Sequence, residues 1–94
     1  MADGDERQRL DRWLFHARIV RTRSAAADLL RAGHVRLDGQ RVTAAAQPVR
    51  RGQVVTIALT GSVRVVRVRG FSERRGDATS VIELLDDITH ETGK

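Results

Sequence analysis

The sequence predicts an α+β domain in which two N-terminal helices pack on a small antiparallel sheet, followed by a short C-terminal helix. Three observations support this fold class. Apolar residues recur with helical spacing in residues 9–32, and an Asp-Gly pair separates two alternating segments in residues 35–42. Valine-rich segments bounded by turn residues then occupy much of residues 53–69, which is typical of antiparallel strands.

Length and composition indicate one domain with a modest core. The chain has 94 residues, of which 40% are hydrophobic and 31% charged, and it contains one proline and no cysteine. We expect flexible tails at residues 1–6 and 89–94 around a single domain at residues 7–88. The lack of cysteine excludes disulfides and thiolate metal sites. No membrane-spanning run and no secretory leader are recognised, so the sequence predicts a cytoplasmic protein.

The first helix is predicted to begin at residue 7 or 9 and to end at residue 18. Its apolar stripe has the spacing of one helix face and consists of Leu10, Trp13, Leu14 and Ala17. Asp11 falls in the first turn, where a negative charge suits the helix dipole. Because Trp13 shares the stripe with leucines, we predict that it lies in the core. Stacking of Trp13 on a nucleobase is the less favoured alternative.

The second helix is predicted for residues 23–32, with Thr22 or Ser24 as its N-cap and with Gly33 at its end. Its inner face carries Ala26, Leu29 and Leu30. The joint Arg21-Thr22-Arg23 places two guanidiniums and a hydroxyl beside the free N–H groups of a helix start, an arrangement that suits a phosphate group. The alternative is a simple cap flanked by solvated arginines.

A β-hairpin is predicted directly after the second helix. Val35 and Leu37 alternate with Arg36, and Asp38-Gly39 is a strong signal for a tight turn. Arg36 and Arg41 are therefore expected on one face of the hairpin. Residues 44–48 are expected to form a loop and residues 48–52 a turn. Strands are predicted at residues 53–59 and 63–69, and the uneven valine spacing in the second strand allows a bulge or burial on both faces.

The C-terminal part is predicted to hold a short amphipathic helix. Asp77 is a plausible N-cap, and the apolar residues with helical spacing are Val81, Leu84, Leu85 and Ile88. A strand at residues 80–84 is the competing interpretation, since valine and isoleucine also suit strands.

The charge distribution indicates a polyanionic partner. The net charge is +5, but residues 7–75 contain sixteen arginines and four acidic residues, a net of +12, whereas the flanking segments total −7. Arginine grips phosphate through a planar fork and stacks on bases. A basic body of this kind favours binding of structured RNA through its phosphates, although a solvated basic surface is the simpler alternative.

Several short motifs occurring in order resemble the alpha-L RNA-binding motif, a domain family also found in bacterial pseudouridine synthases and tyrosyl-tRNA synthetases. The resemblance covers residues 9–57 and is carried by the segments Arg9 to Leu14, Arg21-Thr22-Arg23, Gly33-His34-Val35 and Asp38-Gly39-Gln40. Within the family, residues 13–18 and Arg74-Arg75-Gly76 are most similar to small ribosome-associated heat-shock proteins.

The resemblance implies an RNA-binding surface and a set of residues that form it. Matched by position, these are Arg9, Asp11, Arg12, Arg21, Thr22, Arg23, Arg31, His34, Arg36, Gln40 and Arg41. The arginines are expected to grip phosphates, and Asp11 is expected to orient an arginine. His34 either contacts RNA or makes a structural hydrogen bond. Arg64, Arg67 and Arg69 are weaker candidates, expected on an outer sheet face.

The heat-shock branch further implies binding to free large ribosomal subunits that carry a stalled peptidyl-tRNA, and a role in their recycling. The expected partner is therefore structured RNA, ribosomal or tRNA, bound by a monomer, with no cofactor, no metal and no membrane. Two departures from the family pattern stand out. Asp38 replaces the usual asparagine of the hairpin turn, and residues 76–94 are acidic where the heat-shock branch has a longer basic extension.

Other functions are less well supported by the sequence. A DNA-binding helix-turn-helix fits residues 10–32, but the second helix offers few side chains that read bases. No recognised catalytic motif is present, and His16, His34 and His90 are scattered, so no enzymatic activity is expected. A module acting beside a partner enzyme is a further alternative. The acidic end is also a candidate for docking on a basic protein, or for folding over the basic surface in competition with RNA.

Overall fold

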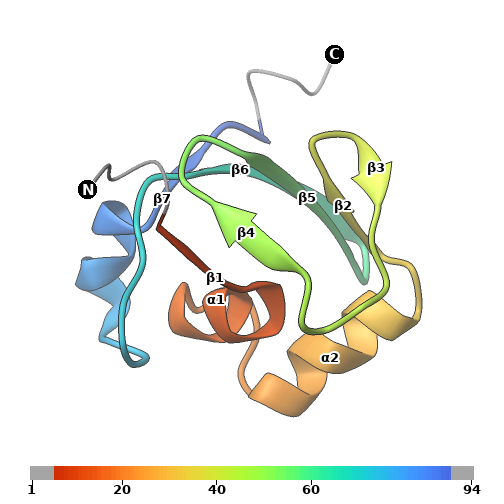
Figure 1. Ribbon diagram of the computed structural model, residues 1–94, viewed down its shortest axis with the longest axis horizontal. Coiled ribbons are helices and arrows are strands. Elements are labelled where there is room, and N and C mark those ends of the chain that lie inside the picture. The colour runs from red at the N-terminus through yellow and green to blue at the C-terminus, as the bar shows by residue number, and fades with distance from the viewer. Residues whose placement is uncertain (1–5, 90–94) are drawn as a thin grey trace.

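Two helices and a five-stranded antiparallel sheet enclose the core of this protein (Figure 1). A computed structural model describes residues 6–89. Its elements are β1 (Arg7–Arg9), α1 (Leu10–His16), α2 (Arg23–Arg31), β2 (Val35–Leu37), β3 (Gln40–Arg41), β4 (Pro48–Arg50), β5 (Val54–Leu59), β6 (Ser62–Val68), the 3-10 helix η2 (Ala78–Glu83) and β7 (Leu85–Asp87). The sheet order is β3-β2-β5-β6-β7, and β1 pairs with β4 in a separate ribbon. The predicted α+β class is confirmed.

Helix α1 packs its predicted apolar stripe into the core. Leu10, Trp13 and Leu14 are fully buried, and Ala17 is nearly so. The base-stacking alternative for Trp13 is therefore wrong. The helix is shorter than predicted, because the backbone N–H of Leu10 donates to Gln47 O at 2.8 Å and the residues before it form a strand.

Helix α2 begins and ends as its local sequence predicts. Of the two candidate caps, Thr22 is the one used, since its Oγ1 accepts from the N–H of Ala25 at 3.0 Å. Gly33 follows the helix with φ of +81°, a conformation that glycine adopts without strain. A Cβ at this position would also lie 3.3 Å from Cδ of Arg41, so the hairpin packs closely on the end of α2.

The hairpin β2–β3 has the predicted turn and register. Asp38 and Gly39 have φ of +51° and +86°, which are the left-handed values of a tight two-residue turn. Arg36 faces Arg41 across the hairpin, as predicted. The Asp38 carboxylate accepts from the N–H of Val54 at 2.9 Å, so this replacement of asparagine ties the turn to the start of β5.

Strands β5 and β6 pair without interruption from Val54–Arg67 to Leu59–Ser62, so no bulge interrupts this register. Val66 and Val68 point into the core, whereas Val63 is exposed on the opposite face. That opposite face of the sheet carries Arg36, Arg41 and Arg67, all exposed. Of the three arginines expected on an outer sheet face, Arg67 lies there. The prediction is wrong for Arg64, which is in register with the buried Ile57, and Arg69 lies beyond the end of β6.

The β1–β4 ribbon was not predicted. Residues 48–52 were expected to be a turn, but Pro48–Arg50 pairs with Arg7–Arg9 in antiparallel register. Val49 is fully buried under the ribbon, which explains why this short segment is extended. The pairing joins residues about forty positions apart, and three-residue strands carry little periodicity to reveal it.

The C-terminal prediction is partly wrong. Helical structure is present, but it is the 3-10 helix Ala78–Glu83, capped by the Asp77 side chain through the N–H of Ser80 at 3.1 Å. Leu85–Asp87 is instead an edge strand on β6. Burial of Leu84, Leu85 and Ile88 accounts for their apolar pattern without an α-helix.

A connecting segment, residues 70–76, runs beside α1. The indole N–H of Trp13 donates to Gly70 O at 3.0 Å, and the amide of Gln8 donates to Ser72 O at 2.9 Å. This segment therefore completes the environment of a helix more than fifty residues earlier in the chain. Within residues 6–89, no helix has the length and apolar character needed to cross a membrane.

Candidate nucleic-acid interface

The joint between α1 and α2 presents two exposed arginines. Thr22 holds the first turn of α2 through its hydroxyl, while Arg21 and Arg23 flank it in exposed positions. Neither guanidinium has a hydrogen bond or an ion pair with residues 6–89. The joint thus combines free positive charge with the N-terminus of a nine-residue helix.

At the start of α1 a buried carboxylate orients an arginine. Asp11 is 4% exposed and accepts from Arg9 twice, with Nε at 3.1 Å from Oδ1 and Nη2 at 3.0 Å from Oδ2. The N–H of Arg12 also donates to Asp11 Oδ1 at 2.7 Å. This geometry matches the predicted orienting role of Asp11. Nη1 of Arg9 and the exposed side chain of Arg12 have no hydrogen bond or ion pair with residues 6–89.

His16 lies beneath this arginine group and is 4% exposed. Its Nδ1 is 2.9 Å from Ser72 O, so this nitrogen carries the hydrogen of the neutral ring. Burial lowers the pKa of His16 most strongly, the Ser72 carbonyl opposes this shift, and the positive charges of Arg12 and Arg23 lower the pKa further. Glu73 acts in the opposite direction.

The lowered pKa of His16 predicts acid sensitivity of the fold. Because the folded pKa lies below the unfolded value of about 6.5, the unfolded chain binds the proton more readily. Stability should be constant above that value and should decrease as the pH falls below it. Urea unfolding at several pH values between 8 and 5 measures this effect. His16→Asn retains a donor toward Ser72 and should remove the dependence; an equal slope in both proteins would contradict the prediction.

The hairpin contributes the remaining predicted residues. Arg36, Gln40 and Arg41 are exposed on β2 and β3, and Nη1 of Arg36 donates to Gly39 O at 3.3 Å. Arg31 is also exposed, but it forms an ion pair with Asp28 one helical turn earlier. The side chain of His34 is exposed and makes no bond within residues 6–89, so the structural hydrogen bonds of this residue come from its backbone.

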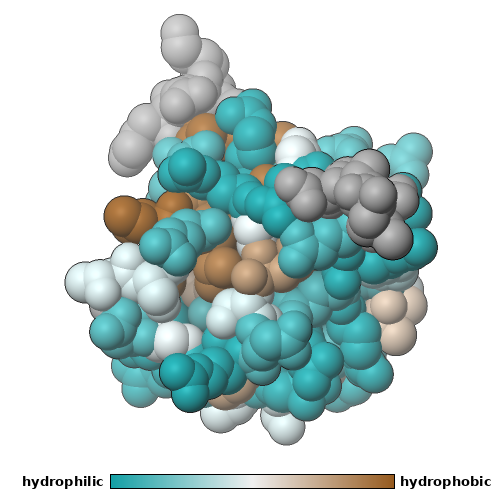
Figure 2. Space-filling model, turned by 60° about the vertical axis from the view of Figure 1, so that its left-hand side comes forward, coloured by the Kyte–Doolittle hydropathy of each residue, from teal (hydrophilic) through white to brown (hydrophobic). Residues whose placement is uncertain are grey.

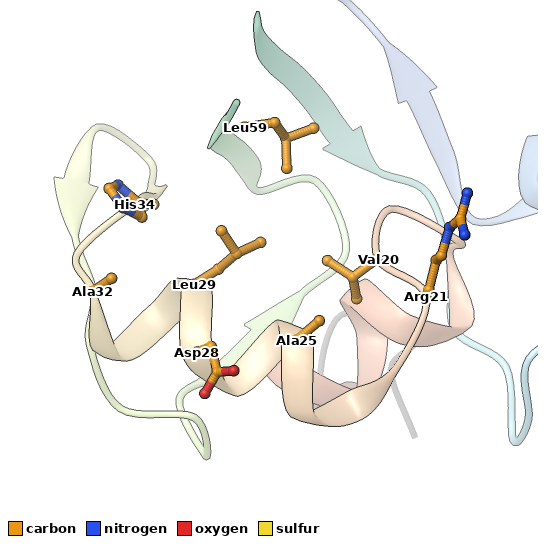
Figure 3. A pocket seen from close by; sticks show the side chains of 8 residues that line it. All are labelled: Val20, Arg21, Ala25, Asp28, Leu29, Ala32, His34 and Leu59. Atoms are coloured by element: carbon orange, nitrogen blue, oxygen red, sulfur yellow. The ribbon is translucent and has the colours of Figure 1, made fainter. Parts of the chain in front are cut away.

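An apolar groove connects the joint with the hairpin (Figure 3). Its volume is about 530 Å³, and it is lined by Val20, Arg21, Ala25, Asp28, Leu29, Ala32, His34 and Leu59. Arg21 and His34 stand at its two ends, with Leu29 and Leu59 between them. The joint and the hairpin lie at opposite ends of α2, about 13 Å apart by helical rise. The joint and the hairpin therefore lie at the two ends of one groove and do not converge on one point.

Two arginines beside β7 differ from those of the joint because acidic residues of β7 neutralise them. Arg64 pairs with Asp87 at 3.2 Å, and Arg69 pairs with Asp86 at 3.4 Å. The acidic residues Asp86 and Asp87 thus lie on β7 and pair with β6, rather than folding over the helix surface. The last part of the acidic end, residues 90–94, lies outside the described residues.

Unneutralised arginines therefore concentrate away from β7. Eight arginines have no side-chain bond or ion pair within residues 6–89, and most of them are on or next to the helices, the hairpin and the ribbon. These eight are Arg7, Arg12, Arg21, Arg23, Arg41, Arg50, Arg67 and Arg74. Figure 2 shows that the face on the side of η2 is mainly hydrophilic, with small hydrophobic patches.

Sequence reasoning missed the structural arginines around α1. Arg75 donates from Nε to Phe15 O at 3.1 Å and from Nη2 to Val20 O at 3.3 Å, and its guanidinium lies 5.1 Å from the centre of the Phe15 ring. Arg18 has φ of +61° and donates to Gly76 O at 3.0 Å. These contacts hold the turn before the joint. The sequence signal for these contacts was the Arg74-Arg75-Gly76 motif, which was recognised by its resemblance to the heat-shock branch but was given no structural role.

The chemistry available to this surface is binding by charge and hydrogen bonding. Its groups are guanidinium donors, backbone N–H groups and one exposed imidazole. Within residues 6–89, no three His, Asp or Glu side chains are grouped as ligands for a metal ion. The surface is suited to a phosphate-bearing polymer.

Comparison with known proteins identifies relatives of this arrangement. A family model described as the S4 domain matches residues 8–55, about half of the chain. "Heat shock protein 15 homolog" of Aeromonas salmonicida is 39% identical over 70 residues, which cover 74% of this chain and 52% of that protein. "Heat shock protein 15" of Escherichia coli K12 is 29% identical over 86 residues, which cover 92% of this chain and 64% of that protein. This chain thus spans about half of the first relative and less than two thirds of the second.

A solved structure shows the same fold. The trimeric structure of Vibrio cholerae Heat Shock Protein 15 matches with a TM-score of 0.81 and 29% sequence identity, and the match covers 87% of this chain and 82% of that chain. The S4 match includes most of β1, both helices, the β2–β3 hairpin and β4, and all eleven residues of the predicted RNA-binding set, from Arg9 to Arg41, lie within it.

Proposed function

Because this chain belongs to the S4 domain family, we propose that it binds structured RNA through an arginine surface on α1, the joint before α2 and the β2–β3 hairpin. The observation that carries the proposal is the distribution of charge. Acidic residues of β7 neutralise Arg64 and Arg69, whereas Arg12, Arg21, Arg23 and Arg41 have no such partner within the described chain.

The proposed contacts are mainly to the RNA backbone. The eleven proposed residues are Arg9, Asp11, Arg12, Arg21, Thr22, Arg23, Arg31, His34, Arg36, Gln40 and Arg41. Asp11 acts by positioning Arg9, and Thr22 acts by shaping the helix start. A surface of this kind recognises the shape of folded RNA and its phosphates rather than its sequence.

The biological target in this proposal is ribosomal RNA of the large subunit, in a cytoplasmic heat-shock or ribosome-recycling role. The support comes from the likeness to proteins named Heat shock protein 15. The alternative target is tRNA or another folded RNA, bound beside a partner enzyme. Crosslinking in cells followed by sequencing of the bound RNA separates the two. A footprint on the large subunit supports the first, and a broad distribution over cellular RNA supports the second.

RNA binding should depend steeply on salt. Five phosphate contacts give a log–log slope of affinity against salt concentration on the order of −3.5 to −4.5. Gel-shift titrations with a ribosomal RNA hairpin between low and moderate salt measure this slope. A slope near zero would contradict binding through phosphates.

The same titration with duplex DNA tests the helix-turn-helix alternative. In this structure α2 leads directly into a hairpin of the five-stranded sheet, and two of its exposed side chains, Asp28 and Arg31, pair with each other. RNA should therefore compete better than duplex DNA at equal salt. Preference for duplex DNA would support the alternative.

The oligomeric state of this chain is proposed to be monomeric, although the Vibrio cholerae relative was solved as a trimer. Light scattering coupled to size exclusion distinguishes the two. A mass near 10.5 kDa corresponds to the monomer.

A further inference from the structure

The β1–β4 ribbon carries a pair of arginines that the proposed surface does not use. Arg7 and Arg50 are direct cross-strand partners, and both are exposed. Residues directly opposite on an antiparallel pair lie about 4.5–5.5 Å apart at Cα. Two like charges at this separation oppose the pairing of the strands, so a ligand that brings negative charge between them would relieve the repulsion.

No acidic side chain of the described residues takes that position. Glu6, the nearest acidic residue in the chain, pairs with Arg51, which also donates to the backbone carbonyl of Arg69. Neither Arg7 nor Arg50 has a side-chain hydrogen bond or an ion pair within residues 6–89. The backbone of Arg50 is fixed by its N–H bond to Oε1 of Gln53 at 2.8 Å, so the pair sits on a defined scaffold.

The ribbon continues into the proposed RNA surface. Alternation along β1 places Arg9 on the same face as Arg7, while Gln8 and Val49 face inward. Arg9 is also the residue directly before α1, which carries Arg12 one turn later. The outer face of the ribbon is thus a charged extension of the α1 surface.

We infer that Arg7 and Arg50 form a second phosphate contact for the same RNA, gripping its backbone where it leaves α1 and crosses the ribbon. This inference rests on the proposed function. RNA is favoured over an acidic protein because the ribbon's outer face offers arginines and Pro48, without the apolar centre that protein interfaces use. Two adjacent guanidinium forks suit successive phosphates of one strand.

The test compares single and double glutamine variants with a matched control. R7Q and R50Q each remove one exposed arginine without a partner in the described chain, whereas the control R69Q removes an exposed arginine that Asp86 already neutralises. Gel-shift titration with a ribosomal RNA hairpin should give a salt slope shallower by about 0.7–0.9 for R7Q or R50Q and by about 1.4–1.8 for R7Q/R50Q. The double variant should bind about tenfold or more weakly at 0.1 M salt, whereas R69Q should match the wild type.

Thermal unfolding and binding of a second polyanion, polyglutamate, show whether a negative result contradicts the ribbon contact or the proposed RNA binding itself. Removing the like-charge pair should leave the melting temperature of R7Q/R50Q unchanged or higher, and R7K/R50K should retain most of the salt slope. A salt slope for R7Q/R50Q equal to that of R69Q overturns the inference. The inference is also overturned if R7Q/R50Q binds polyglutamate, an acidic polypeptide, more weakly than the wild type but binds RNA equally well. If the wild-type protein itself does not bind the RNA, the proposed function has failed. If it binds, and R21E/R23E weakens binding while R7Q/R50Q does not, the ribbon contact alone has failed.

Discussion

Reversing the charges at the joint, in Arg21→Glu/Arg23→Glu, should weaken binding of structured RNA by about a hundredfold or more at 0.1 M salt. Both side chains are exposed and unpaired within residues 6–89, so their charge is available to phosphates. Losing two contacts also reduces the salt slope by about 1.4–1.8, and the added negative charges repel the backbone. Gel-shift titration of a ribosomal RNA hairpin over a range of salt measures both quantities.

The same double variant should fold normally. Thr22 keeps its capping bond to Ala25, and a glutamate in the first turn of α2 interacts favourably with the helix dipole. Circular dichroism and thermal unfolding should therefore show no loss of stability. Arg69→Glu, at a position already paired with Asp86 of β7, is the control for added negative charge. Unchanged RNA affinity in a folded Arg21→Glu/Arg23→Glu protein would refute the proposed surface.

Replacing Trp13 by alanine should destabilise the domain by about 3–5 kcal/mol, the usual cost of emptying a tryptophan site. The side chain is fully buried, and its indole N–H donates to Gly70 O. Small domains are stable by about 5–15 kcal/mol in total, so much of the population should be unfolded under mild denaturant. Because Trp13 is the single tryptophan of the chain, unfolding must be followed by circular dichroism.

Two further variants separate packing from hydrogen bonding at this site. Trp13→Phe keeps most of the volume but leaves the Gly70 carbonyl without its donor, a cost of about 1–3 kcal/mol. Ile82→Ala changes a residue that is 69% exposed and should have little effect. Equal midpoints of urea unfolding for Trp13→Ala and Ile82→Ala would be incompatible with the described core.

Local signals were sufficient for the core face of α1, for α2 and for the β2–β3 hairpin. The stripe of α1, the Thr22 cap, Gly33 and the Asp38-Gly39 turn each depend on neighbouring residues, and the structure has each of them where the sequence placed it. In the candidate site, two features were predicted in the same way from neighbouring residues. These are the bond by which Arg9 donates to Asp11 and the cross-strand pairing of Arg36 with Arg41.

Contacts between distant residues were not accessible in this way. The ribbon pairs Gln8 with Val49, and burial of His16 depends on Ser72. His16 lies off the apolar stripe of α1, so periodicity alone suggested an exposed side chain. The secondary structure of the C-terminal apolar residues was ambiguous, because their spacing fits a helix and their residue types also suit a strand. Pairing with β6 makes residues 85–87 a strand. Ion pairing of β6 with Asp86 and Asp87 likewise depends on pairing that no local pattern encodes.

The position of residues 70–76 beside α1 has a consequence for vectorial synthesis. Trp13 and His16 lack their backbone partners until Gly70 and Ser72 have been made, and Arg75 closes the turn before the joint last. Because synthesis begins at the N-terminus, α1 and α2 are made first and lack their contacts with residues 70–76 until those residues have been added. We therefore expect nascent chains shorter than about residue 76 to be open to proteases, and the two helices to become fixed late in translation.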